Sequence, residues 1–130
     1  MKVRGGFDVQ MTPADGPLAA EGIALARFAL DKRYHGALTG TGVGSMLTSS
    51  TDTSGAAAYV ALERVAGTLQ GRAGSFVLAH LGTMTKERQE LSIQVVPGSG
   101  TGALAGLTGT MHIVIENKAH VYEFEYELPG

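Results

Sequence analysis

Hydrophobic and polar residues alternate with a period of two over most of this chain, from Phe7 to Leu128. Successive side chains of a β-strand point to opposite faces, so this alternation is typical of strands that bury one face. A helical period of about 3.6 residues is found only between Pro17 and Leu25, and one short helical turn is expected at residues 103–107. The alternation therefore predicts an all-β chain with little helix.

Short turns rich in glycine, asparagine and aspartate interrupt the alternation and delimit about eight strands. The predicted strands cover residues 7–12, 23–31, 34–50, 56–69, 74–84, 91–96, 108–116 and 121–128. The third of these contains Gly36, Gly40, Gly42 and Gly44, which suggest bulges or a strongly coiled strand.

An antiparallel sheet of about eight strands closes into a barrel whose interior is filled by side chains or holds one small ligand. Closure pairs both edge strands and buries one face of every strand, whereas a flat sheet would leave two edges exposed. A closed antiparallel β-barrel is therefore the predicted architecture, and a two-sheet sandwich is the alternative.

Size and composition narrow the classes of function. The 130 residues are predicted to form a single domain, 1–130. Only 17% of the residues are charged and the net charge is -2, which leaves no basic surface for a nucleic acid. The absence of cysteine excludes disulfides, thiolate nucleophiles and zinc–thiolate sites. No apolar run reaches the ~20 residues of a membrane helix and the start lacks an apolar signal segment, so a cytoplasmic location without membrane partners is expected.

Three stretches carry a family resemblance: RFALDK at 27–32, YVALERVAGTLQGRAGSF at 59–76 and VPGSGTGALAGLTG at 96–109. Together they resemble the bacterial domain-of-unknown-function family DUF3224, over nearly the whole chain. The last stretch is also similar to a turn in plant allene oxide cyclases and dirigent proteins, which share an eight-stranded barrel. The resemblance implies an allene oxide cyclase-like barrel, a cytoplasmic bacterial origin and no established activity. No catalytic residue of the plant proteins maps onto a matching motif here.

Glu63 and His80 are the candidate catalytic residues. Glu63 shares its strand face with Tyr59 and Val65, and His80 shares its face with Phe76, so both side chains are expected to point into the barrel. Burial disfavours the charged carboxylate, which predicts a raised pKa for Glu63 unless Arg64 or another cation compensates. A structural ion pair and a satisfied core histidine are the alternative interpretations.

Aromatic and methionine side chains on the inward faces are the candidate ligand-binding residues. They are Tyr59, Phe76, Met111, Tyr122 and Tyr126. Such side chains form an adaptable wall suited to an apolar or aromatic molecule, although each also fits an ordinary role in the core.

No metal and no cofactor is predicted. His112, Glu116 and His120 lie near one turn but lack the spacing of a His-x-His or HExxH site. The glycine-rich loops at 40–44 and 98–102 are not followed by a helix, which a phosphate cradle requires.

Three hypotheses of function follow. The chain is a cofactor-free isomerase, cyclase or lyase in which Glu63 and His80 move protons, a module that only binds a small apolar molecule, or a filled barrel that assembles through its outer face. An open cavity of the ~300 Å³ class shared by both residues would favour the first. Outward apolar residues, Val60, Leu62, Val77 and Leu81, predict a homodimer or another small homo-oligomer.

Overall fold

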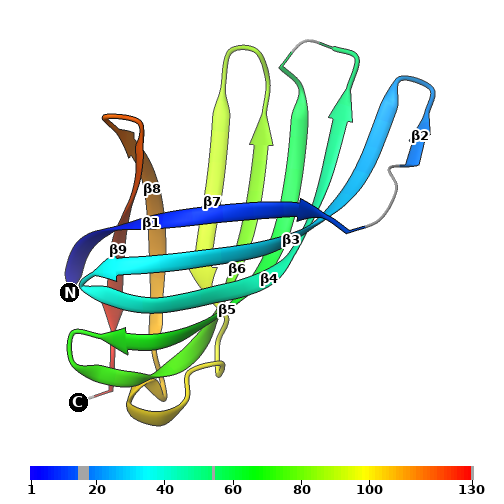
Figure 1. Ribbon diagram of the computed structural model, residues 1–130. Coiled ribbons are helices and arrows are strands. Elements are labelled where there is room, and N and C mark those ends of the chain that lie inside the picture. Colours follow the sequence, from blue (N-terminus) through cyan, green and yellow to red (C-terminus); the bar gives the residue numbers. More distant parts are fainter. Residues whose placement is uncertain (15–17, 54, 130) are drawn as a thin grey trace.

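The computed structural model describes residues 1–14, 18–53 and 55–129 and is built almost entirely from antiparallel strands (Figure 1). The strands are β1 (Lys2–Pro13), β2 (Leu18–Ala20), β3 (Ile23–Gly36), β4 (Leu38–Thr51), β5 (Ala57–Leu69), β6 (Arg72–Met84), β7 (Gln89–Val95), β8 (Thr108–Glu116) and β9 (Ala119–Glu127). A single turn of 3₁₀ helix, η1 (Gly102–Leu104), falls at the predicted helical turn. The all-β prediction is confirmed.

Strand pairing closes the sheet into a barrel. The strand order is β1-β9-β8-β7-β6-β5-β4-β3-β2, and β1 also pairs with β3, from Gly5 opposite Gly36 to Pro13 opposite Phe28. The described strands of the ring are therefore the eight other than β2, which pairs with β3 outside the closure. This confirms the closed antiparallel barrel and excludes the two-sheet sandwich.

The first third of the chain departs from the prediction in two places. Pro17 lies outside the described residues, and the rest of the window with a helical period forms β2 and the start of β3, because strand pairing outweighs a weak local pattern. Tyr34 belongs to β3 and not to the next strand, since β3 continues to Gly36, where the chain reverses and a φ of 101° suits glycine.

The glycines of β4 do not form the bulges that were expected. The pairing of β4 with β3 and with β5 runs without interruption through Gly40, Gly42 and Gly44. Gly42 instead provides space inside the barrel, because a Cβ atom there would overlap the carboxylate of Glu63. The alternative of a coiled strand agrees better with the curvature of β4 in Figure 1.

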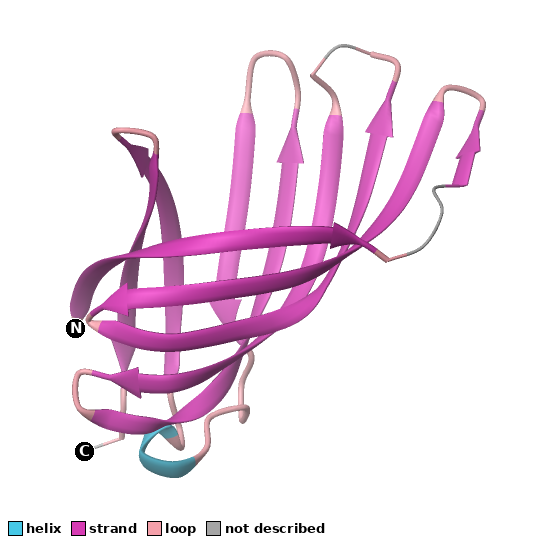
Figure 2. Cartoon of the chain, viewed as in Figure 1, coloured by secondary structure: helices cyan, strands magenta, loops and turns pink. Residues whose placement is uncertain are grey.

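One end of the barrel is filled by a hydrophobic core. Leu38, Leu69 and Leu104 are fully buried there, and η1 lies across this end (Figure 2). The opposite end is wider, where the long hairpins β4–β5 and β6–β7 extend beyond β1 (Figure 2). No helix formed by the described residues is long and apolar enough to cross a membrane.

Candidate functional site

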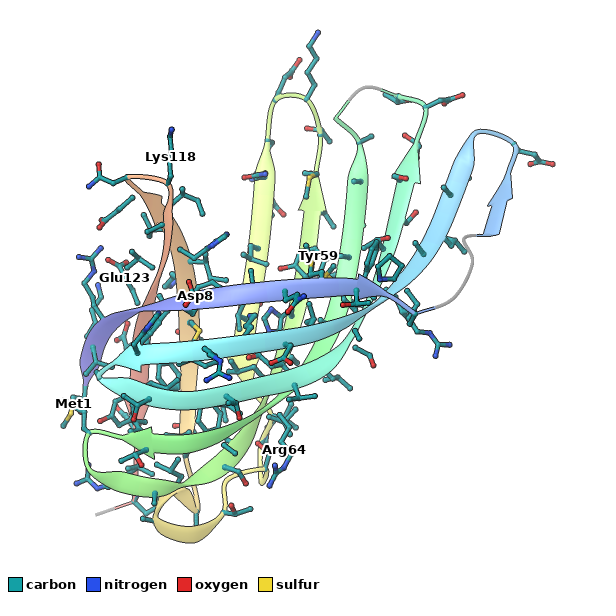
Figure 3. The ribbon with its side chains drawn as sticks, viewed as in Figure 1. Met1, Asp8, Tyr59, Arg64, Lys118 and Glu123 are labelled. Carbon is teal, nitrogen blue, oxygen red and sulfur yellow. The ribbon has the colours of Figure 1, made fainter. Side chains whose placement is uncertain are left out.

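A cavity of about 420 Å³ occupies the wide end of the barrel. Its wall is mostly apolar and is contributed by β1 and β3 to β9. The lining residues are Phe7, Val9, Met11, Leu30, Lys32, Met46, Thr48, Ser49, Ser50, Ala57, Ala58, Tyr59, His80, Met84, Leu91, Ile113, Ile115 and His120. Tyr59 lies toward this end in Figure 3, away from η1. The barrel is therefore a cup, with a packed base and an open interior above it.

A buried carboxylate lies beside this cavity and accepts three hydrogen bonds. Oε1 of Glu63 lies 3.0 Å from Nζ of Lys32 and 3.0 Å from Nε2 of His80, while Oε2 accepts from the hydroxyl of Tyr34. Glu63 has no exposed surface, and Lys32 and His80 are each 5% exposed. Charge-assisted hydrogen bonds of this kind offset the cost of burying the carboxylate.

Neighbouring strands bring these side chains together by register. Lys32 pairs with Gly42, and Glu63 pairs with Gly44 on the same strand, β4. Because Gly42 has no side chain, the carboxylate of Glu63 can extend across β4 toward Lys32. The strand β4 lies between β3, which carries Lys32, and β5, which carries Glu63, and its glycine leaves the space for their ion pair.

The expected inward orientation of Glu63 and His80 is found, and the stated exception to a raised pKa of Glu63 applies, because a cation other than Arg64 compensates. Burial alone would raise this pKa, yet the hydrogen bond from His80, the charge of Lys32 and the hydroxyl of Tyr34 together hold it below its usual value. The compensating cation is Lys32. Arg64 lies on the outer face, where its guanidinium donates to Oγ of Ser75 at 3.3 Å.

Lys32 and Tyr34 were missed by the sequence reasoning. Both lie on the strand face of Leu30, so the alternation of β3 placed them inside the barrel. The ammonium of Lys32 lies 5.0 Å from the ring centre of Phe7 and 5.9 Å from that of Tyr34. Burial, followed by the nearby charge of Glu63, raises the pKa of Tyr34 well above its usual range, so its hydroxyl stays protonated.

Among the candidate ligand-binding residues, Tyr59 lines the cavity. Its ring centre is 6.4 Å from that of His80. Gly82 lies opposite Tyr59 on β6, and a Cβ atom there would overlap the tyrosine ring. Burial, and then the charge of Glu63, raises the pKa of this half-buried tyrosine, which keeps its hydroxyl neutral.

The other four candidates lie in the packed core and not in the wall of the cavity. Phe76 stacks on Phe124 with ring centres 5.9 Å apart. Met111 is 2% exposed within the same core. The hydroxyl of Tyr122 accepts from the backbone of Leu38 at 2.8 Å. The fourth, Tyr126, donates from its hydroxyl to the side chain of Gln70 at the closed end.

The two histidines near the β8–β9 turn lie on opposite faces of the sheet. His112 is exposed and lies opposite Glu123 in the strand register, whereas the ring of His120 packs 5.1 Å from that of Phe7 beside the cavity. Within the described residues no group of three or more His, Asp or Glu side chains is placed to hold a metal ion.

Comparisons with known proteins identify relatives that share the whole barrel. The model of the family "Protein of unknown function (DUF3224)" matches residues 3–126. A crystal structure of a DUF3224 protein of unknown function from Shewanella oneidensis MR-1 is 47% identical, with a TM-score of 0.96 over 100% of this chain and 98% of that one. No curated protein matches. The likeness of residues 100–109 to the plant proteins stays a prediction.

Proposed function

Because the chain belongs to DUF3224, a family of proteins of unknown function, we propose its function from its geometry: it binds a small, largely apolar molecule in the open end of the barrel. The observation that carries this proposal is the cavity of about 420 Å³. Pockets for small molecules commonly have about 300–1,000 Å³ and combine an apolar wall with a few polar groups. A barrel that served only as a scaffold would gain stability from filling this space.

Binding of N-phenyl-1-naphthylamine, a neutral apolar fluorophore, tests the proposal. Fluorescence should rise and saturate with the wild-type protein. Ala57→Trp places a large ring in the cavity and should weaken binding about ten-fold or more, since overpacking costs about 1–3 kcal/mol.

Val60→Trp is the matched control for this experiment. Val60 lies on the same strand but on the outer face, where it is 45% exposed. It should leave the affinity for the fluorophore unchanged. Equal affinities in all three proteins would place the fluorophore outside the cavity and contradict the proposal.

Proton transfer to or from the bound molecule is a second candidate function, favoured by the hydrogen bond between Glu63 and His80. A carboxylate that accepts from one imidazole nitrogen fixes the tautomer, which leaves the other nitrogen as a base. His80 lines the cavity and Glu63 does not, so His80 would contact a substrate while Glu63 positions it.

Exchange of the acidic C–H protons of 2-tetralone, an aromatic ketone, with D₂O tests this second candidate by NMR. Exchange that the wild-type protein accelerates and that His80→Leu abolishes would support it. Exchange at the rate of buffer alone would leave binding without chemistry as the function.

A further inference from the structure

The polar groups beside the cavity restrict the chemistry of the molecule that fits it, and this inference rests on the proposed function. All three hydrogen bonds to Glu63 come from donors, because its carboxylate is paired with the ammonium of Lys32 at 3.0 Å and an ionised carboxylate only accepts. The Nε2 atom of His80 must therefore carry the proton that it shares with Oε1. In the neutral imidazole the remaining nitrogen, Nδ1, is then an acceptor.

Within the part of the chain that the structure describes, Nδ1 of His80 is an unpaired atom of a residue that lines the cavity. No residue that the structure describes makes a hydrogen bond to this atom, and within the same residues no side-chain nitrogen or oxygen is both fully buried and unpaired. Nδ1 therefore retains accessible surface, and His80 is one of the residues that line the cavity. A bound molecule that donates a hydrogen bond would meet a free acceptor there.

Lys32 is the cation of this cluster. Its ammonium has three hydrogens, and one of them is used by Oε1 of Glu63. Both Nζ of Lys32 and Nε2 of His80 lie 3.0 Å from this one oxygen, so the two side chains are immediate neighbours. Lys32 also lines the cavity.

The charges of this cluster already cancel. Lys32 carries one positive charge, Glu63 carries one negative charge, and the hydroxyl of Tyr34 is protonated. Apart from Lys32, the described lining contains no lysine, arginine, aspartate or glutamate. A charged group on the bound molecule would therefore be desolvated without a counter-ion, which is costly.

We infer that the molecule bound in this cavity is apolar and carries a neutral hydroxyl group, which donates to Nδ1 of His80. A hydroxyl donates through its hydrogen without carrying a charge. An ether can only accept, and a carboxylate adds an unpaired charge. Among molecules of similar shape, the cavity should therefore bind the one with a hydroxyl group more tightly than the one with an ether or a carboxylate.

Three naphthalene probes of similar shape test the inference by calorimetric titration at neutral pH. They are 2-naphthol, 2-methoxynaphthalene and 2-naphthoate. The hydroxyl compound should bind about five-fold more tightly than the ether, the value of one net hydrogen bond, and the carboxylate should bind most weakly. His80→Leu should bring the affinities of 2-naphthol and 2-methoxynaphthalene together, whereas His120→Leu, at a histidine that also lines the cavity, should preserve their ratio.

The wild-type protein provides a second measurement that does not depend on any variant. The ¹⁵N resonance of Nδ1 in His80 should shift when 2-naphthol is added and stay unchanged with 2-methoxynaphthalene. Equal affinity for these two probes, or preference for 2-naphthoate, would overturn the inference and leave the proposed function intact. If none of the three probes bound, the proposed function would fail together with the inference.

Discussion

Glu63 is the shared hydrogen-bond partner of Lys32, Tyr34 and His80. Glu63→Gln keeps the shape but leaves the ammonium of Lys32 without its counter-ion. Removing one partner of a buried pair costs about 3–5 kcal/mol, and we expect a loss of that size in the free energy of unfolding measured with urea.

Glu127→Gln is the control for this prediction, since Glu127 is exposed and should tolerate the change within about 0.5 kcal/mol. Replacing both partners, with Lys32→Met and Glu63→Gln, should recover part of the loss, because no unpaired ammonium remains and the amide oxygen of glutamine can still accept a hydrogen bond. Unfolding of Glu63→Gln at the wild-type urea concentration would contradict the central role of the carboxylate.

The lowered pKa of Glu63 also predicts how stability depends on pH. A carboxyl group whose pKa is lower in the folded state than in the unfolded state stabilises the fold fully above its unfolded pKa, about 4.3. This contribution is lost as the pH falls through the folded pKa. The difference in unfolding free energy between wild type and Glu63→Gln should therefore be constant from neutral pH down to about 5 and shrink below about 4. A difference that grew on acidification would contradict the lowered pKa.

At the scale of the strand, Gly42 of β4 makes space for the side chain of Glu63 on β5. Gly42→Ala would push a Cβ atom into the carboxylate of Glu63, so we expect a loss of about 1–3 kcal/mol from overpacking. Thermal unfolding measures this. Gly6→Ala is a matched control, because the nearest atom to its added Cβ would be 3.5 Å away, and it should be close to neutral. Equal melting temperatures for the two variants would show that the carboxylate of Glu63 does not need the space at Gly42.

The strands themselves could be predicted because alternation is a local property. The expected ranges 108–116 and 56–69 agree with β8 and β5 to within a residue. The ion pair could not be predicted in the same way, since the partner of Glu63 depends on which strand lies across Gly42. The alternation predicts that Phe76 and Tyr59 both point into the barrel, but it does not give their depth along the barrel axis. Phe76 lies in the packed core and Tyr59 lies in the wall of the cavity, because this depth depends on the stagger of the strands.

At the scale of the whole molecule, the outer surface carries an apolar patch formed by β4, β5 and β6. We define this outer apolar patch as Val43, Leu47, Val60, Leu62 and Leu81, each at least 45% exposed. Val60 pairs with both Leu47 and Leu81, so the patch is continuous across the three strands. Val77, which was also expected to face outward, is half-buried and is not part of the patch.

Single exposed apolar side chains are common on protein surfaces, whereas a continuous apolar patch is typical of an interaction surface. We therefore expect self-association into a dimer or another small closed oligomer. Sedimentation velocity at micromolar concentration should show a species heavier than the 13.5 kDa chain, and Leu62→Glu should shift it toward the monomer. Thr41→Glu, exposed on β4 outside the patch, is the control. A wild-type protein that sediments as a monomer would contradict this expectation.

The central claim is that the open end of the barrel binds a small molecule. An NMR titration of the ¹⁵N-labelled protein with 2-naphthol tests this claim most directly. The backbone amide signals of Met46, Tyr59 and Met84, around the cavity, should shift in a saturable way. Those of Leu104 and Tyr126 at the closed end should stay in place. Shifts confined to the outer apolar patch, or no shift at high probe concentration, would contradict the account.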